Sequence, residues 1–220
     1  ISAEEAELEL NYINNLHGLV GDEGILERVE SMIKTKAGGE TVKILDIGSA
    51  SEMTHLRILK EKFGDRIEVY GIDKERADVR ALEAEGLHYL RGDAATVLRQ
   101  QIADRRTFDI IFSSASFLYF KEKENALKYV VELLATGGWA SIHVKDLNRI
   151  LPNFESSIAP RIAGREATVN RAIGFYSEDH HFRVLPEHLD QTGIPEDLPG
   201  NVQLVPIIRI QRSAAPAMPA

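Results

Sequence analysis

Apolar residues gather in short runs that alternate with amphipathic segments along the first two thirds of the chain. The largely apolar run from Val42 to Leu45 is typical of a strand that is buried on both faces, as in a parallel sheet. Similar runs predict strands at residues 66–73, 88–93, 108–113 and 139–144, and a helical period covers residues 122–135. Strands that alternate with helices in this way indicate the α/β class.

The two ends of the chain carry weaker patterns. Residues 3–16 and 24–36 look like two helices that precede the first strand, with glycines between them. After the fifth strand, residues 182–185 and 202–210 are the remaining strand candidates. Pro206 lies inside the last of these, which predicts an edge strand or a bulge at that position. The Ala- and Pro-rich residues 213–220 predict a disordered tail.

The residues that follow the first strand carry the clearest functional signal. Asp46 precedes Gly48, where the backbone is expected to turn sharply. The next helix is expected to begin near Glu52, with Ser49 or Ser51 as its cap. A strand, an acid, a glycine turn and a helix start together predict a cradle for a nucleoside-containing ligand.

The charge of this turn indicates which nucleoside it would hold. A pyrophosphate-binding turn has the pattern G-x-G-x-x-G, and this turn matches only the first glycine, at Gly48. Glu52 would also place a carboxylate where a pyrophosphate needs positive potential. Asp46 suits a ligand that is positively charged at this point, such as S-adenosylmethionine with its ammonium and sulfonium groups. A dinucleotide is disfavoured.

Two further acids stand at the ends of later strands. Asp73 ends the second predicted strand, where an acid can accept hydrogen bonds from ribose hydroxyls. Asp93 ends the third, where it could accept a hydrogen bond from the exocyclic amine of an adenine. Both predictions agree with a nucleoside ligand.

In their order and spacing, the motifs between residues 40 and 146 resemble those of class I S-adenosylmethionine-dependent methyltransferases. The resemblance rests on Ile-Leu-Asp46-Ile-Gly48-Ser, Gly-Ile-Asp73, Arg-Gly-Asp93-Ala, Phe-Asp109-Ile-Ile-Phe and Leu-Leu-Ala-Thr-Gly137-Gly138. It implies that the turn at Gly48 holds the methionine end of the cofactor, Asp73 the ribose, and Asp93 with Ala94 the adenine. The cofactor-binding residues that it implies are Asp46, Gly48, Ser49, Ala50, Asp73, Lys74, Asp93, Ala94 and Ser113.

The same resemblance implies a doubly wound, seven-stranded, mostly parallel sheet with helices on both faces and one antiparallel strand near the C-terminus. Residues 39–212 would form the S-adenosylmethionine-binding domain, residues 1–38 a helical lid or a plain cover for the sheet, and residues 213–220 the tail. Many members of the family have glycines where Ala50 and Glu52 stand here. An alanine at that place is tolerated if its backbone stays at negative φ.

Composition narrows the class of substrate and partner. The 220 residues suffice for one α/β domain with its own core. A net charge of −8 argues against a nucleic-acid substrate, which needs a basic surface. There is no apolar run of the about 20 residues that span a bilayer and no signal-peptide segment, so a cytoplasmic location is expected. The expected partners are a small-molecule substrate and either a second copy of the chain or a neighbouring domain of a larger protein.

The chemistry of methyl transfer asks the protein mainly to align an acceptor and, where needed, to remove a proton. His143, on the fifth predicted strand, is the best-placed candidate for a catalytic base. The alternative is a packed imidazole that is bonded to a backbone carbonyl. Tyr119 could line the acceptor pocket, although simple packing would also suit an aromatic residue there.

A metal site is not expected. The chain has no cysteine, which excludes a thiolate zinc site. His180 and His181 are adjacent, and adjacent residues of an extended chain point to opposite faces. The predicted function is therefore metal-independent transfer of a methyl group to an oxygen or nitrogen atom of a small molecule. The alternative is a catalytically silent, methyltransferase-like module that binds or scaffolds.

Overall fold

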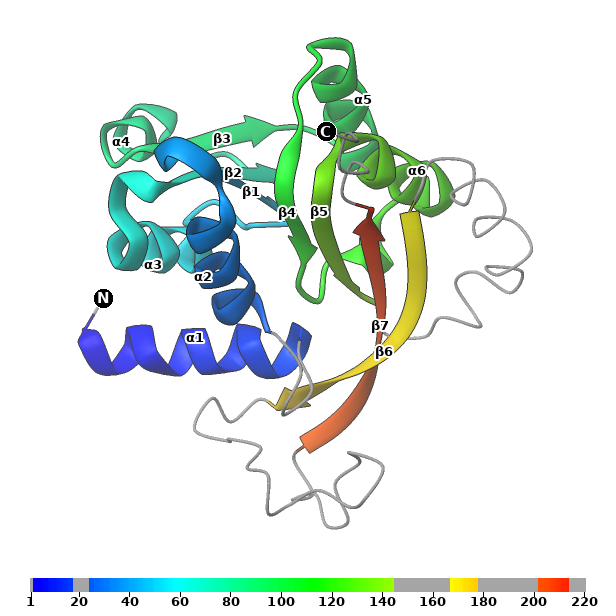
Figure 1. Cartoon of the computed structure of the whole chain (residues 1–220), viewed down its shortest axis with the longest axis horizontal. Helices are drawn as coiled ribbons and strands as arrows, with labels where there is room; N and C mark the ends of the chain where they lie inside the picture. The colour runs from blue at the N-terminus through cyan, green and yellow to red at the C-terminus, as the bar shows by residue number, and fades with distance from the viewer. Residues whose placement is uncertain (1, 18–23, 145–166, 178–201, 214–220) are drawn as a thin grey trace, which may run out of the picture.

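The computed structural model describes residues 2–17, 24–144, 167–177 and 202–213. Over these residues the chain forms a seven-stranded sheet with the strand order β3-β2-β1-β4-β5-β7-β6. Figure 1 shows this sheet with helices on both of its faces. The expected α/β class, with a mostly parallel sheet, is confirmed.

Five strands form the parallel part of the sheet. They are β1 (Val42–Ile47), β2 (Ile67–Asp73), β3 (Leu87–Arg91), β4 (Phe108–Ser113) and β5 (Leu134–His143). β1 pairs with β2 and β4, while β3 pairs with β2 and β5 with β4. Every residue of β4 is buried, as expected of a central parallel strand. The carboxyl ends of the five strands therefore share one edge of the sheet.

The C-terminal part of the sheet differs from the prediction at one point. β7 (Val202–Arg212) runs antiparallel to both β5 and β6 (Ala167–Ser177), which confirms the expected antiparallel strand. The edge position predicted from Pro206 is wrong, because β7 lies between two strands. Pairing of β7 with β5 stops at Ile207, so Pro206 is paired only with Ile173 of β6. A proline, which has no N–H to donate, therefore meets one partner strand instead of two.

Six α-helices complete the described fold. They are α1 (Ala3–His17), α2 (Ile25–Thr35), α3 (Thr54–Phe63), α4 (Val79–Ala84), α5 (Ala94–Ala103) and α6 (Lys123–Leu133). Short 3₁₀ turns occur at Ala37–Gly39, Gly64–Arg66 and Phe117–Tyr119. Helices α1, α2 and α3 contribute to one hydrophobic core, and α5 and α6 to the core on the opposite face. The two helices expected before the first strand are confirmed.

Three local predictions need correction. Helix α3 begins at Thr54 and not near Glu52, because its N-cap residue Met53 has a left-handed backbone with φ of +49°. No side chain caps this helix, so the serine cap is wrong. β5 begins at Leu134, directly after α6, and not at residue 139. Gly137 and Gly138 therefore lie inside this strand. The sixth strand was placed at residues 182–185, which lie outside the described residues, and β6 was not expected.

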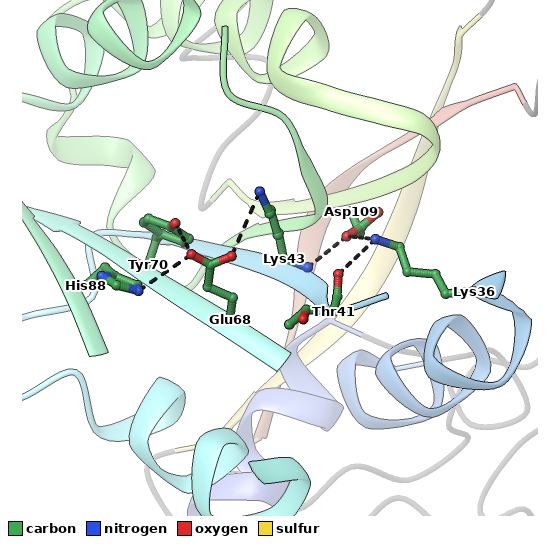
Figure 2. Close-up of polar contacts among 7 residues, drawn as sticks. All are labelled: Lys36, Thr41, Lys43, Glu68, Tyr70, His88 and Asp109. Carbon is green, nitrogen blue, oxygen red and sulfur yellow. Dashed lines mark hydrogen bonds and ion pairs between the residues drawn. The ribbon is translucent and has the colours of Figure 1, made fainter. Parts of the chain in front are cut away.

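The amino-terminal edge of the sheet is held by buried and half-buried charges (Figure 2). Asp109 of β4 is only 8% exposed. Its Oδ2 accepts hydrogen bonds from Lys36 Nζ at 2.8 Å and from the backbone N–H of Lys43 at 2.7 Å. Lys36 Nζ also donates to the carbonyl of Thr41 at 2.9 Å. One carboxylate thus ties the end of α2 to the start of β1 and β4.

A second group at this edge lies beside the first (Figure 2). The Tyr70 hydroxyl donates to Glu68, and the ring of Tyr70 stacks on His88 with 4.6 Å between centroids. Lys43 Nζ and His88 Nε2 lie 3.9 and 3.6 Å from the Glu68 carboxylate. Burial, and then the hydrogen bond to Glu68, raise the pKa of Tyr70 to about 12. Each charged side chain of these two groups therefore has a polar neighbour.

Candidate functional site

A cleft of about 360 Å³ opens at the carboxyl edge of the sheet. Its size falls within the range of small-molecule sites. It is lined by Gly48, Ile72, Asp73, Lys74, Glu75, Gly92, Asp93, Ala94, Ala115, Ser116, Tyr119 and Phe120. The structure thus brings together five of the predicted cofactor-binding residues, namely Gly48, Asp73, Lys74, Asp93 and Ala94. Tyr119, which is 74% exposed, also lines the cleft as proposed.

The turn after β1 requires its glycine. Gly48 has φ of +86°, and its N–H donates to the carbonyl of Ile72 at 2.7 Å. A Cβ at this position would lie 2.2 Å from Ser116 Oγ, so a side chain cannot fit without displacing the segment after β4. The turn and that segment are therefore in close contact at the floor of the cleft.

Ala50, two residues further on, does not meet the condition of a negative φ. Its φ is +56°, which lies in the left-handed region. A left-handed conformation costs a residue with a Cβ about 1–2 kcal/mol. The conformation points the N–H of Ala50 at Asp73 Oδ2, with 3.1 Å between the atoms. Ala50 thus supports an acid that lines the cleft while its own side chain is exposed.

Asp73 is held in place by two backbone donors. Its Oδ2 accepts from Ala50 and its Oδ1 accepts from the N–H of Glu75, also at 3.1 Å. Each carboxylate oxygen has two lone pairs, so both oxygens can still accept a hydroxyl of a ligand. A carboxylate fixed in this way at the end of β2 suits the predicted ribose contact.

Asp93 shares its side chain between the cleft and a helix. It is the N-cap of α5, and its Oδ1 accepts from the N–H of Ala95 at 3.2 Å. Capping fixes the direction of the carboxylate, and Ala94 follows as the first residue of the helix. The predicted adenine contact therefore has an oriented acceptor on the cleft wall.

Asp46 precedes the Gly48 turn and does not line the cleft. It is 2% exposed, and its Oδ1 has no hydrogen-bond partner among the described residues. Burial raises the pKa of Asp46 to about 7, against a smaller lowering by nearby His55. Buried carboxylate oxygens without a partner are uncommon and costly. This oxygen is the strongest local indication that a polar or cationic group from a ligand belongs here.

Ser49 and Ser113 also lie outside the lining. Ser113 is fully buried, and its Oγ donates to the carbonyl of Ile47 at 2.8 Å. Ser49 is 8% exposed, and its Oγ would lie 2.4 Å from a Cβ placed on Gly71. Both serines therefore support the turns around the cleft. The resemblance implied that they contact the cofactor directly, but neither lines the cleft.

His143, the candidate base, does not line the cleft. It is 4% exposed, and its Nδ1 accepts the N–H of Ala115 at 3.0 Å. Ala115 lines the cleft and has φ of +52°. His143 therefore helps to hold the backbone after β4. The alternative to a catalytic base was an imidazole bonded to a backbone carbonyl, and the partner is instead a backbone N–H.

His17, at the end of α1, is a site residue that the sequence did not indicate. It is completely buried, with Nδ1 2.8 Å from Ser141 Oγ and Nε2 2.9 Å from Ser114 Oγ. Burial holds the pKa of His17 well below its usual value. Its partners lie 124 and 97 residues away in the sequence, so no local pattern could reveal them. Through Ser114, α1 is connected to the segment that lines the cleft.

Glu52, the residue that departs most from the resembled motif, is exposed. It accepts a hydrogen bond from Ser51 Oγ at 2.8 Å and does not line the cleft. The carboxylate is therefore turned toward solvent.

Two findings concern other functional classes. Within the described ranges, no group of three or more His, Asp or Glu side chains is arranged to hold a metal ion. His180 and His181 lie outside those ranges. No helix in the described part of the chain is both long enough and apolar enough to cross a membrane.

Comparison with known proteins finds a family match in the middle of the chain. The family model of the methyltransferase domain matches residues 45–142. The CurJ carbon methyltransferase is 15% identical with a TM-score of 0.51, over 84% of this chain and 52% of that one. The DszA carbon methyltransferase is 13% identical with a TM-score of 0.51, over 87% and 52%. The YcgJ protein from Bacillus subtilis is 16% identical with a TM-score of 0.46, over 86% and 100%. No curated protein matches the chain by sequence.

The structural matches support a conclusion about the fold. The chain spans about half the length of the two carbon methyltransferases. At 15% and 13% identity, the likeness shows a shared fold, and the accepting atom has to be argued from this chain's own cleft.

Proposed function

We propose that this chain is a class I S-adenosylmethionine-dependent methyltransferase, as the match of residues 45–142 to the methyltransferase domain supports, and that it methylates an oxygen or nitrogen atom of a small molecule without a metal. The observation that carries this proposal is the cleft at the carboxyl edge of the sheet. Its floor is the Gly48 turn and its walls hold Asp73 and Asp93. The distribution of charge fits a cofactor with a cationic end and a nucleoside end.

Each part of the cofactor has a matching group in the chain. The backbone of the Gly48 turn would hold the methionine end, Asp73 the ribose hydroxyls and Asp93 the adenine amine. Asp46, whose Oδ1 has no partner among the described residues, would supply negative potential beneath the ammonium group. When bound, S-adenosylmethionine supplies a methyl group that its sulfonium already activates. The remaining task of the protein is to align the acceptor.

The residues after β4 would contact the acceptor. Tyr119 and Phe120 line the cleft with Ser116, so this wall combines aromatic rings with a hydroxyl. Such a surface favours a small, moderately hydrophobic molecule that carries one or two polar groups. The net charge of −8 supports a small-molecule acceptor over a nucleic acid.

The orientation of the polar side chains bears on the chemistry of the acceptor. His143 Nδ1 is engaged by the backbone of Ala115 and does not line the cleft, so it is not proposed as a base. An acceptor that is already nucleophilic at neutral pH, such as a carboxylate or an unprotonated amine, needs no base. This argument favours oxygen or nitrogen over carbon, because a carbon acceptor would need a proton removed.

Calorimetric titration tests the cofactor. S-adenosylmethionine and S-adenosylhomocysteine are each expected to bind at one site, while NAD is expected to give no heat. Loss of binding in Gly48→Val, with Glu52→Gln as the matched control, would place the ligand in the cleft. Binding of both ligands without any later transfer of label would favour the catalytically silent module.

Transfer of an isotope-labelled methyl group tests the acceptor. The enzyme is incubated with cofactor carrying a ¹³C-labelled methyl and a metabolite extract that has been treated with a chelator. The label is expected in the low-molecular-weight fraction, and its carbon chemical shift distinguishes O-, N- and C-methyl groups. Label in protein or nucleic acid, or a C-methyl signal, would contradict the proposal.

A further inference from the structure

The outer edge of β3 is open to a partner strand. β3 is the end strand of the sheet, and within the described residues no strand lies beyond it. The N–H of Gly92 donates to the carbonyl of Asp73 in β2 at 2.8 Å. The carbonyl of Arg91 belongs to the same peptide plane and therefore points the opposite way, toward the outside. Because the direction alternates along a strand, the backbone groups of Tyr89 and Arg91 face outward and those of Leu90 face β2.

This edge borders a groove between β3 and α5. The groove has a volume of about 630 Å³ and is lined from both elements. Its apolar lining includes Leu90, Val97 and Ala103. Gln101, also in the lining, is 4% exposed, and its Oε1 has no hydrogen-bond partner among the described residues. A buried acceptor without a partner is costly, so the groove offers a place for a donor from another molecule.

The charge of the groove is opposite to that of the protein. Two arginines, Arg91 and Arg99, line it, and none of its described lining residues is an Asp or Glu. Both arginines are exposed, and neither forms an ion pair with a carboxylate within the described ranges. In a chain with a net charge of −8, a groove that carries only positive charge selects an acidic occupant.

We propose that an extended, acidic segment of a partner protein binds here as an added strand on the outer edge of β3. Its backbone pairs with the outward-facing groups of Tyr89 and Arg91, and its carboxylates pair with Arg91 and Arg99. Apolar side chains of the same segment enter the groove beside Leu90 and Val97. Strand addition of this kind gives affinity through the backbone and specificity through alternate side chains.

Three synthetic peptides serve as probes. The first alternates valine and glutamate, the second alternates valine and lysine, and the third is the glutamate peptide with alternate amides N-methylated. The glutamate peptide is expected to bind at least about tenfold more tightly than either control. Equal affinity for the lysine peptide would remove the charge argument, and equal affinity for the N-methylated peptide would remove strand pairing.

The alternation of backbone direction gives a readout at single residues. When the glutamate peptide is added, the backbone amides of Tyr89 and Arg91 are expected to exchange their hydrogens with solvent more slowly, as measured by NMR. The amide of Leu90, which already faces β2, is expected to be unchanged. Protection of all three amides, or of none, would contradict the proposed pairing.

A charge-reversed variant completes the test. Arg91→Glu with Arg99→Glu is expected to exchange the preference, so that the lysine peptide binds more tightly than the glutamate peptide. Unchanged binding of S-adenosylhomocysteine shows that the variant is folded, because neither arginine lines the cofactor cleft. Tighter binding of an oligothymidylate than of the glutamate peptide to the parent protein would assign the groove to nucleic acid and overturn the proposal.

Discussion

Asp109 and Asp46 lie on neighbouring strands and are both almost completely buried, at 8% and 2% exposure, yet their surroundings differ. Asp109, at the amino-terminal edge, receives an ammonium group and a backbone N–H on one oxygen. Asp46, near the carboxyl edge, has an oxygen without a partner in the described chain and a pKa raised to about 7 by burial. The amino-terminal edge therefore satisfies its buried carboxylate within the chain. The carboxyl edge leaves a carboxylate oxygen that a ligand could satisfy.

The backbone shows a related contrast. Among the described residues, four non-glycine residues have positive φ. Two of them, Ala50 and Ala115, lie beside or in the cleft, and a third, Met53, is the N-cap of α3. Strained conformations persist where the surrounding structure holds them, and they cluster at functional sites. Changes at the amino-terminal edge should therefore act mainly on stability, and changes at the carboxyl edge should act more strongly on ligand binding.

The largest expected effect is a loss of stability at the amino-terminal edge. Asp109→Ala removes the acceptor shared by Lys36 and Lys43 and leaves a partly buried ammonium unpaired. We expect the free energy of unfolding to fall by about 3 kcal/mol, measured by urea denaturation. S-adenosylhomocysteine affinity is expected to stay within twofold of the parent value. A stable variant with weakened ligand binding would reverse the proposed roles of the two edges.

The second prediction is a dependence of stability on pH that Asp46 causes. Its pKa is about 7 in the fold, against an ordinary value of 3.8, so between these two pH values the folded protein holds a proton that the unfolded chain releases. Stability therefore falls as pH rises through this window. Relative to Asp46→Asn, the parent is expected to lose about 2 kcal/mol between pH 5 and pH 8. Urea unfolding of both proteins across this range measures the difference, and parallel curves would refute the assignment.

The same substitution is expected to weaken the ligand. Asp46→Asn removes negative charge from beneath the Gly48 turn, so S-adenosylhomocysteine should bind about tenfold more weakly at pH 8, a change of roughly 1.4 kcal/mol. Glu52→Gln is the matched control, because Glu52 is an exposed acid of the same segment that does not line the cleft. It should change affinity little. Equal losses in the two variants would mean that only the general field of the segment matters.

The smallest effect is expected from relief of backbone strain. Ala50→Gly and Arg105→Gly each replace a residue at φ of +56°, one beside the cleft and the other before β4 at the opposite edge. Each should raise the free energy of unfolding by up to about 1 kcal/mol, measured by thermal unfolding. S-adenosylhomocysteine affinity should not change in the Arg105 variant. A loss of stability in Ala50→Gly would contradict the left-handed conformation.

The parts of the fold that could be predicted are those with local signals. The strands β1 to β4 are apolar runs with clear ends. Asp73 is the last residue of β2, and Asp93 comes two residues after the end of β3. β6 was missed because Asn170 and Arg171 interrupt any apolar pattern there. The start of α3 was misplaced because no side-chain cap marks it and Met53 has a left-handed backbone.

A site residue could be predicted only where its own place in the sequence indicates its role. Alternation along β1 places Asp46 on the face opposite Leu45 and Ile47, which pack in the core of α5 and α6. That alternation explains why Asp46 does not line the cleft. The roles of His17 and Asp109 depend on partners that only the folded chain brings near, so sequence reasoning gave no signal for them.

The attachment of the first helix to the last strand has a consequence for synthesis on the ribosome. The carbonyl of His17 accepts a hydrogen bond from Arg209, 192 residues later, at 2.8 Å, and Leu16 packs with Val205 and Ile207. In Figure 1, α1 accordingly reaches toward β6 and β7. A nascent chain grows at about 5–20 residues per second, so α1 waits tens of seconds at the slower rate before β7 exists. During that time its apolar side is exposed to chaperones, and deletion of β7 should leave this helix accessible to protease.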